Sequence, residues 1–148
     1  MSIKAALIGV GGYGYMYVEN FCRLVEEKRI ELIAAVDFFP EKWQERIDKL
    51  QAHGAKILKD ANELYKLGVK FDLIGLPVGI ESHEPLTVQA LEAGCNVMVE
   101  KPIAGSLKAV ENIIAAQTHL NQLTIPFSMN RSVGWEDFKA VQLIVKTV

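Results

Sequence analysis

The chain has few of the residues that cross-link a small protein or hold a metal ion. Its 148 residues include 2 cysteines and 3 histidines, and Cys22 and Cys95 are too far apart to form a C-x-x-C motif. The sequence therefore predicts neither a disulfide framework nor a metal site. Two free, buried thiols in a reducing compartment are the simplest interpretation of this cysteine usage.

A large excess of charge and a long apolar segment are also missing. The 16 basic and 18 acidic residues leave a net charge of −2, which gives no electrostatic footprint for nucleic acid or an anionic membrane. No apolar stretch approaches the roughly 20 residues that span a bilayer, and the N-terminus shows no signal peptide. We expect a cytoplasmic protein without nucleic-acid or membrane partners, and homo-oligomer formation stays open.

What the chain does contain is an alternation of short apolar runs and longer amphipathic segments. Several runs are continuous in Leu, Ile, Val and Ala, which is typical of parallel strands covered on both faces. They predict strands at residues 3–10, 31–37, 55–58, 71–76, 96–100 and 124–128, and the segments between them predict helices at 13–28, 41–53, 62–66, 83–93 and 107–119. Repeated strand–helix units predict an α/β fold with a doubly wound, mostly parallel sheet, the Rossmann fold.

Capping residues mark several of these helix ends. Asp60 is the predicted N-cap of the short third helix, and Ser82 is the predicted N-cap of the fourth, with Pro85 in its first turn. Gly54 and Gly94 follow the second and fourth helices directly, where glycine commonly ends a helix.

A glycine-rich loop follows the first predicted strand. Gly9, Gly11 and Gly14 fit the pattern G-x-G-x-x-G. In that pattern the first glycine permits a tight turn, the second lets the backbone approach a pyrophosphate, and the third lets the next helix pack closely. We therefore predict a cofactor-binding loop that also includes Gly12 and Tyr13, although Tyr13 could equally pack as an aromatic at the helix start.

The second predicted strand ends in a carboxylate, as a dinucleotide site requires. Asp37 lies 23 residues after the last glycine of the loop, near the offset at which a carboxylate binds the adenosine ribose. Because Phe38 and Phe39 follow without an arginine, NAD is favoured over NADP, and the nearby Lys42 makes that preference moderate. The alternative is that Asp37 only caps the helix predicted to begin at Glu41.

The end of the fifth predicted strand carries a second candidate group. Lys101 follows this strand directly, and the carboxyl ends of parallel strands form the edge where such sheets bind ligands. An ammonium there could hydrogen-bond a substrate oxygen, stabilise developing charge or help to pass a proton. The alternative is a solvated lysine that begins a loop.

These and further residues resemble the Gfo/Idh/MocA family of oxidoreductases over nearly the whole chain, up to about residue 131. The most specific of them is the Glu100-Lys101-Pro102 step after a strand. The others are Asp37 with Pro40-Glu41, Pro77, His83, Ala90-Leu91-Glu92-Ala93-Gly94, Val97-Met98-Val99 and Met129-Asn130-Arg131.

The resemblance implies a function and roles for individual residues. It implies an NAD(P)-binding Rossmann domain of an oxidoreductase that moves a hydride between nicotinamide and a sugar, polyol or related hydroxyl or carbonyl substrate. Lys101 would act in catalysis and in binding beside the nicotinamide of the cofactor, and Glu100 would orient it or contact the ribose. Pro77 and His83 would lie on a loop along the cofactor, and Asn130 would contact it from the same sheet edge.

In this family the substrate pocket comes from a C-terminal domain, which we expect to be absent here. Residues 1–131 are the predicted dinucleotide-binding domain, and 132–148 are a predicted terminal helix leading toward the missing domain. The main alternative is a non-catalytic NAD-binding regulatory or sensor module. A reductase of the same fold for an imine or tetrapyrrole, or a subunit that docks through its terminal helix, are the others.

Overall fold

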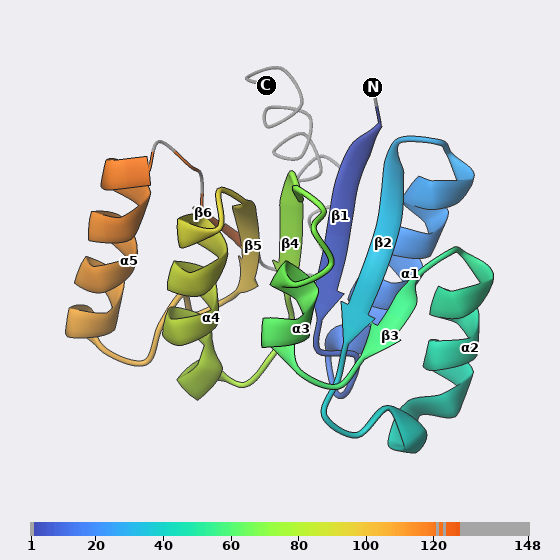
Figure 1. Ribbon diagram of the computed structural model, residues 1–148. Coiled ribbons are helices and arrows are strands. Elements are labelled where there is room, and N and C mark those ends of the chain that lie inside the picture. The colour runs from blue at the N-terminus through green and yellow to red at the C-terminus, as the bar shows by residue number, and fades with distance from the viewer. Residues whose placement is uncertain (1, 121, 123, 128–148) are drawn as a thin grey trace.

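The computed structural model describes residues 2–120, 122 and 124–127. Six parallel strands form one sheet in the order β3-β2-β1-β4-β5-β6 (Figure 1). The strands are β1 (Ile3–Ile8), β2 (Ile30–Val36), β3 (Lys56–Leu58), β4 (Leu73–Leu76), β5 (Asn96–Glu100) and β6 (Thr124–Phe127). This is the strand order of the Rossmann fold, and it confirms the predicted fold class.

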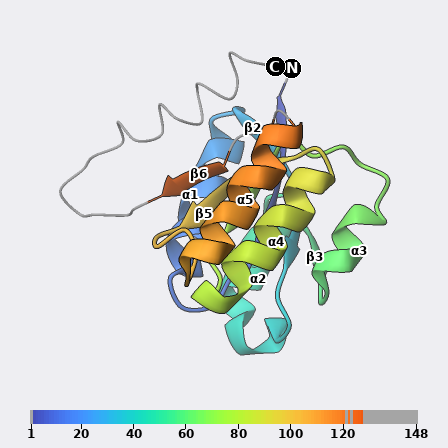
Figure 2. The same ribbon diagram turned by 90° about the vertical axis from the view of Figure 1, so that its left-hand side faces the viewer.

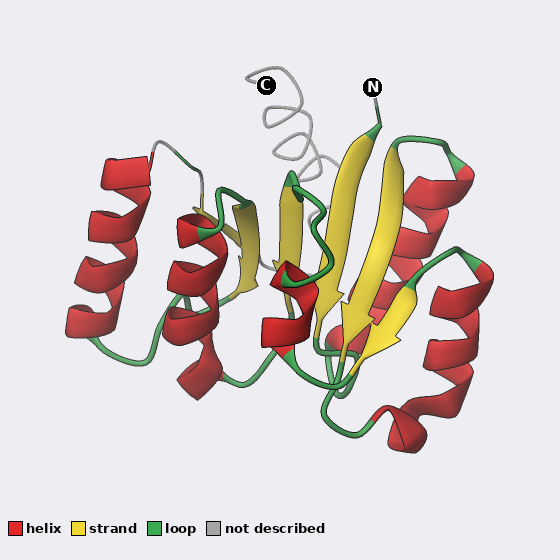
Figure 3. Cartoon of the chain, viewed as in Figure 1, coloured by secondary structure: helices red, strands yellow, loops and turns green. Residues whose placement is uncertain are grey.

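Helices cover both faces of this sheet (Figure 3). They are α1 (Gly14–Glu26), the 3-10 turn η1 (Pro40–Trp43), α2 (Gln44–Ala52), α3 (Ala61–Tyr65), α4 (Ile80–Glu92) and α5 (Leu107–Leu120). Helices α1 and α2 pack on one face, and α3 and α4 on the other, with α5 lying beside α4 (Figure 2).

The burial of the strands explains their continuous apolar sequences. Ala5 and Leu7 of β1 belong to the core beneath α1 and α2, whereas Ala6 and Ile8 belong to the core beneath α3 and α4. Successive residues of a strand point to opposite faces of the sheet. Both faces are covered, so no position of this strand's inner part can be polar.

Two predicted helix starts differ from the structure. Helix α4 begins at Ile80 with Gly79 as its N-cap, because the Ser82 N–H already donates to the Gly79 carbonyl at 2.9 Å. The predicted Ser82 cap was therefore wrong, and Pro85 lies inside the helix instead of in its first turn. The predicted helix 41–53 divides into η1 and α2, since the backbone leaves the helical region at Trp43.

The predictions for three helix ends and for the two cysteines are confirmed. Asp60 caps α3 by accepting the Asn62 N–H at 2.8 Å, and Gly54 and Gly94 follow α2 and α4 with positive φ. Cys22 and Cys95 are free and buried, and burial raises the pKa of each thiol to about 11. Within the described ranges, no helix is long and apolar enough to cross a membrane, and no cluster of three or more potential metal ligands occurs.

Candidate cofactor-binding site

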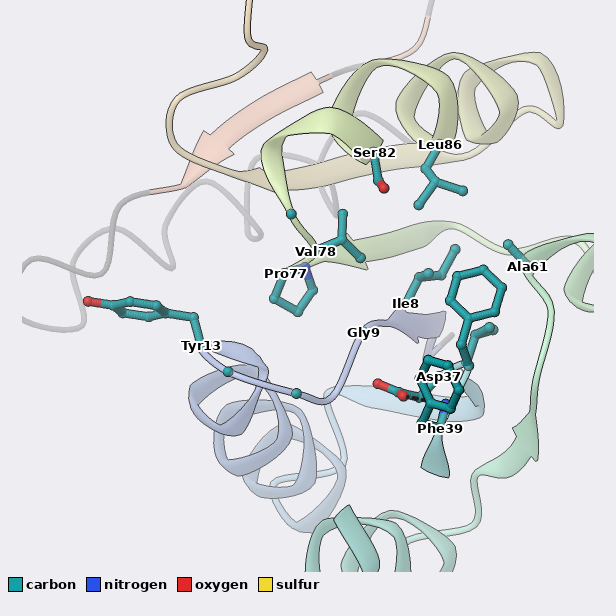
Figure 4. A pocket seen from close by; sticks show the side chains of 15 residues that line it. Ile8, Gly9, Tyr13, Asp37, Phe39, Ala61, Pro77, Val78, Ser82 and Leu86 are labelled. Carbon is teal, nitrogen blue, oxygen red and sulfur yellow. Dashed lines mark hydrogen bonds between the residues drawn. The ribbon is translucent and has the colours of Figure 1, made fainter. Parts of the chain in front are cut away.

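A cavity of about 450 Å³ opens at the carboxyl ends of β1, β2 and β4 (Figure 4). Its volume lies in the range of roughly 300–1,000 Å³ that is typical of small-molecule sites. It also lies where the strand order reverses, between β1 and β4, and open α/β sheets bind ligands at this point. The residues that line it are Ile8, Gly9, Gly11, Gly12, Tyr13, Val36, Asp37, Phe38, Phe39, Ala61, Pro77, Val78, Gly79, Ser82 and Leu86.

The backbone of the glycine loop is tightly enclosed at its two ends. At Gly9, which has a φ of +96°, a Cβ would lie 2.9 Å from Val78 Cγ1 and 3.0 Å from the Pro77 carbonyl oxygen. At Gly14, a Cβ would lie 2.9 Å from the Gly9 carbonyl oxygen. The first glycine thus brings β1 against the loop after β4, and the third brings α1 against the end of β1, as the pattern predicts.

The middle of the loop presents hydrogen-bond donors. Within the described part of the chain, the backbone N–H groups of Gly11, Gly12 and Tyr13 have no hydrogen-bond partner. They precede the first turn of α1, where the positive end of the helix dipole also favours an anion. A Cβ at Gly12 would meet no atom within 4 Å. Three consecutive amides beside open space fit the pyrophosphate of a dinucleotide.

Asp37 lies at the end of β2 and accepts hydrogen bonds from the backbone of two neighbouring segments. Its Oδ2 accepts the Val10 N–H at 3.0 Å, and its Oδ1 accepts the Phe39 N–H at 2.9 Å. The N-cap of η1 is Phe39, without a side-chain cap, so the alternative role of Asp37 as a helix cap is wrong. A carboxylate has about four lone-pair sites, so its oxygens can still accept hydrogen bonds from ribose hydroxyls.

The side chain of Tyr13 does not reach into the cavity. In Figure 4 its ring points away from Asp37 and Pro77, and the residue is 69% exposed. Its contribution to the cavity is therefore its backbone.

The Glu100-Lys101-Pro102 step leaves the end of β5 at the same sheet edge. The Lys101–Pro102 peptide bond is cis, and Lys101 is exposed. Glu100 accepts a hydrogen bond from the Tyr17 hydroxyl at 3.1 Å. Burial, and then the charge of Glu100, hold the pKa of Tyr17 far above its usual range. The phenol therefore stays a donor and fixes the carboxylate beside Lys101.

His83 lies behind the cavity, buried to 2% exposure. Its Nδ1 is 2.9 Å from the Pro102 carbonyl oxygen, and its Nε2 is 3.0 Å from the Val78 carbonyl oxygen. The ring thus connects the loop after β5 with the loop after β4. Its observed contacts are with backbone carbonyls, while Pro77 on the same loop lines the cavity directly.

The structure brings some of the predicted residues together and separates others. The glycine loop, Asp37 and Pro77 share the cavity, whereas Glu100, Lys101 and His83 lie outside its lining. Asn130, Arg131 and the predicted terminal helix 132–148 lie outside the described residues.

Sequence reasoning missed two residues at this site, namely Trp43 and Arg46. Trp43 lies beside Gly11, and Arg46 donates to the carbonyl of Val10. The spacing of Trp43 and Arg46, three residues apart, was the one local signal that they could act together.

Comparison with known proteins decides the family. The model of an oxidoreductase family with an NAD-binding Rossmann fold, Gfo/Idh/MocA, matches residues 3–126. The chain belongs to this family. The match confirms the predicted resemblance and the predicted cofactor, NAD, because the Gfo/Idh/MocA domain is an NAD-binding one.

Individual relatives of this Gfo/Idh/MocA chain are much longer. A glycosyl hydrolase family 109 protein from Shewanella sp. (strain W3-18-1) is 26% identical, and the match covers 96% of this chain and 31% of that protein. The myo-inositol 2-dehydrogenase of Lactobacillus plantarum has a TM-score of 0.77 at 20% identity, covering 99% of this chain and 42% of that one. The WlbA dehydrogenase of Chromobacterium violaceum, solved with NADH and UDP-GlcNAcA, has a TM-score of 0.76 at 21% identity, covering 88% and 36%.

Proposed function

We propose that this chain is the cofactor-binding part of an NAD-dependent oxidoreductase that moves a hydride between nicotinamide and a sugar, polyol or related hydroxyl or carbonyl compound. The observation that carries the proposal is the position of Lys101. It follows β5, two strands from the glycine loop on β1, at the same carboxyl edge of the sheet. Groups at this edge face ligands bound at the switch point.

The chemistry assigned to Lys101 follows from charge. NAD held at the glycine loop and Asp37 would supply the acceptor for a hydride from an alcohol carbon, and NADH would supply the donor for a carbonyl carbon. When the alcohol is oxidised, its hydroxyl proton must also leave, and negative charge gathers on that oxygen. The Lys101 ammonium stabilises this charge, and Glu100, held by Tyr17, keeps the lysine's surroundings ordered.

The substrate class rests on likeness. An inositol dehydrogenase and a dehydrogenase solved with a nucleotide sugar share this fold, and a relative similar in sequence is named as a glycosyl hydrolase. Each of these names points to a cyclic compound with several hydroxyl groups. The chain spans 31% to 42% of the length of these three proteins.

A lysine variant tests the assignment in the intact protein. Cyclic polyols and sugars are screened with NAD by the appearance of NADH, and Lys101→Ala is then compared with wild type. We expect kcat to fall by about 10²–10³ while NAD affinity is unchanged. Lys108→Ala is the matched control, because Lys108 is an exposed lysine paired with Glu111 on α5.

Two outcomes would count against the proposal. If Lys101→Ala retained the wild-type rate, the catalytic assignment would be wrong. If wild type bound NAD but oxidised none of the compounds, the result would favour the alternative, a non-catalytic NAD-binding regulatory or sensor module.

A further inference from the structure

Arg46 reaches the glycine loop from the second helix. It is the third residue of α2, and its Nη1 donates to the Val10 carbonyl oxygen at 2.5 Å and to the Gly12 carbonyl oxygen at 3.4 Å. Both acceptors belong to the loop that carries the free amides. The contact with Gly12 is longer than a typical N–H···O hydrogen bond, so the Val10 carbonyl is the main acceptor.

Two aromatic rings hold the guanidinium in this position. Its central carbon lies 4.8 Å from the centroid of the Trp43 ring and 5.7 Å from that of Tyr15. A planar guanidinium stacks on aromatic faces and loses less freedom than an ammonium when it binds. Trp43 in turn packs against Gly11, where a Cβ would lie 2.8 Å from its Cζ2. Arg46 and Trp43 therefore enclose the outer side of the loop.

Asp37 and Arg46 together fix the two peptide groups of Val10. The Val10 N–H donates to Asp37, and the Val10 carbonyl accepts from Arg46. Residues from the end of β2 and from α2 thus fix the backbone on either side of this one residue. The contacts with Arg46 use carbonyl oxygens alone, so the neighbouring N–H groups of Gly11, Gly12 and Tyr13 are left for an anion.

The guanidinium of Arg46 has N–H donors that its contacts with the loop do not use. Of the ion pairs between described residues, none involves Arg46. A guanidinium carries five N–H donors, and the contacts with the loop use Nη1 alone.

We propose that Arg46, supported by Trp43, is a positioning residue for the cofactor's pyrophosphate. It holds the carbonyl groups of the glycine loop so that the loop's free amides keep their direction before the cofactor binds, which lowers the ordering cost of binding. The proposal rests on NAD binding at this loop and not on hydride transfer, so it can fail or succeed independently of the proposed reaction.

A ligand series separates this role from a general effect on folding. Binding of NAD, ADP-ribose and adenosine to the intact protein is measured by calorimetry for wild type and Arg46→Ala. Because the loop faces the pyrophosphate, we expect the variant to bind NAD and ADP-ribose about tenfold or more weakly and by the same factor. Adenosine lacks the pyrophosphate, so its affinity should not change.

Two further variants complete the test. Lys49→Ala removes a positive charge from the same helix without touching the loop, since Lys49 pairs with Glu19; it should bind NAD as wild type does. Arg46→Lys keeps the charge and one donor group, and should recover part of the lost affinity. Far-ultraviolet circular dichroism confirms that each variant is folded.

Several results would overturn the inference. One is wild-type NAD affinity in Arg46→Ala, another is an equal loss for adenosine, and a third is an equal loss in Lys49→Ala. A wild-type protein that bound no NAD would instead refute the cofactor site itself, so the two failures are distinguishable.

Discussion

The contact between Gly11 and Trp43 predicts that one substitution should repair another. In Gly11→Ala the new Cβ would lie 2.8, 3.0 and 3.2 Å from three atoms of the Trp43 ring, well inside the usual carbon–carbon contact of about 3.5–4.0 Å. Overpacking of this kind typically costs about 1–3 kcal/mol. The φ of Gly11 is not in the left-handed region, so alanine should meet no backbone strain, and the ring alone should cause the loss.

Trp43→Ala removes the ring and is the second single variant of a double-mutant cycle. Trp43 is partly buried against the core beneath α1 and α2, so Trp43→Ala should cost less than the roughly 3–5 kcal/mol of a fully buried aromatic. In the double variant the methyl group at position 11 has room. The two losses should therefore not add, and we expect a coupling free energy of about 1–3 kcal/mol in favour of the double variant.

Urea unfolding of the four proteins measures this coupling. The urea midpoints are compared with the same denaturant slope m for all four proteins, so that a change in midpoint reports a change in stability alone. Losses that add to within about 0.3–0.5 kcal/mol would refute the reasoning. NAD titration of the double variant provides a separate result. Recovered stability without recovered affinity would show that the glycine is also needed for the approach of the pyrophosphate.

Two more predictions concern Asp37 and His53. Asp37→Asn keeps one oxygen acceptor, so it loses the hydrogen bond to either Val10 or Phe39. It also removes the charge that repels a 2′-phosphate, so the preference for NAD over NADP should fall by about tenfold or more; an unchanged ratio in paired titrations would contradict this. The pKa of His53 is raised by its hydrogen bonds to Glu26 and then to the Lys49 carbonyl. Its contribution to stability is full below the unfolded pKa of about 6.5 and is lost as pH rises through the higher folded pKa. Relative to His53→Gln, the free energy of unfolding should therefore fall by a few tenths of a kcal/mol, up to about 1 kcal/mol, between about pH 6 and pH 8; parallel urea-unfolding profiles for the two proteins would contradict it.

The fold and the cofactor side of the site could be predicted from local patterns. Strands covered on both faces are apolar at their covered positions, and the spacing of Gly9 and Gly14 reflects a local contact, since Gly14 packs against the Gly9 carbonyl. Asp37 could be found because its distance along the chain from the loop is set by one helix and one strand.

The supporting contacts could not be predicted, because they join distant parts of the chain. Arg46 and Val10 are 36 residues apart, and Tyr17 and Glu100 are 83 apart. No periodicity links such pairs. The break of the predicted second helix at Trp43 could not be predicted either, since the Trp43 ring packs against Gly11 in a distant loop.

The buried ring of His83 connects the wall of the cavity with the backbone beside Lys101. Val78 lines the cavity, and its carbonyl and that of Pro102 lie against opposite nitrogens of one imidazole. A change in the position of Val78 would therefore be passed to the backbone next to Lys101 through a single side chain.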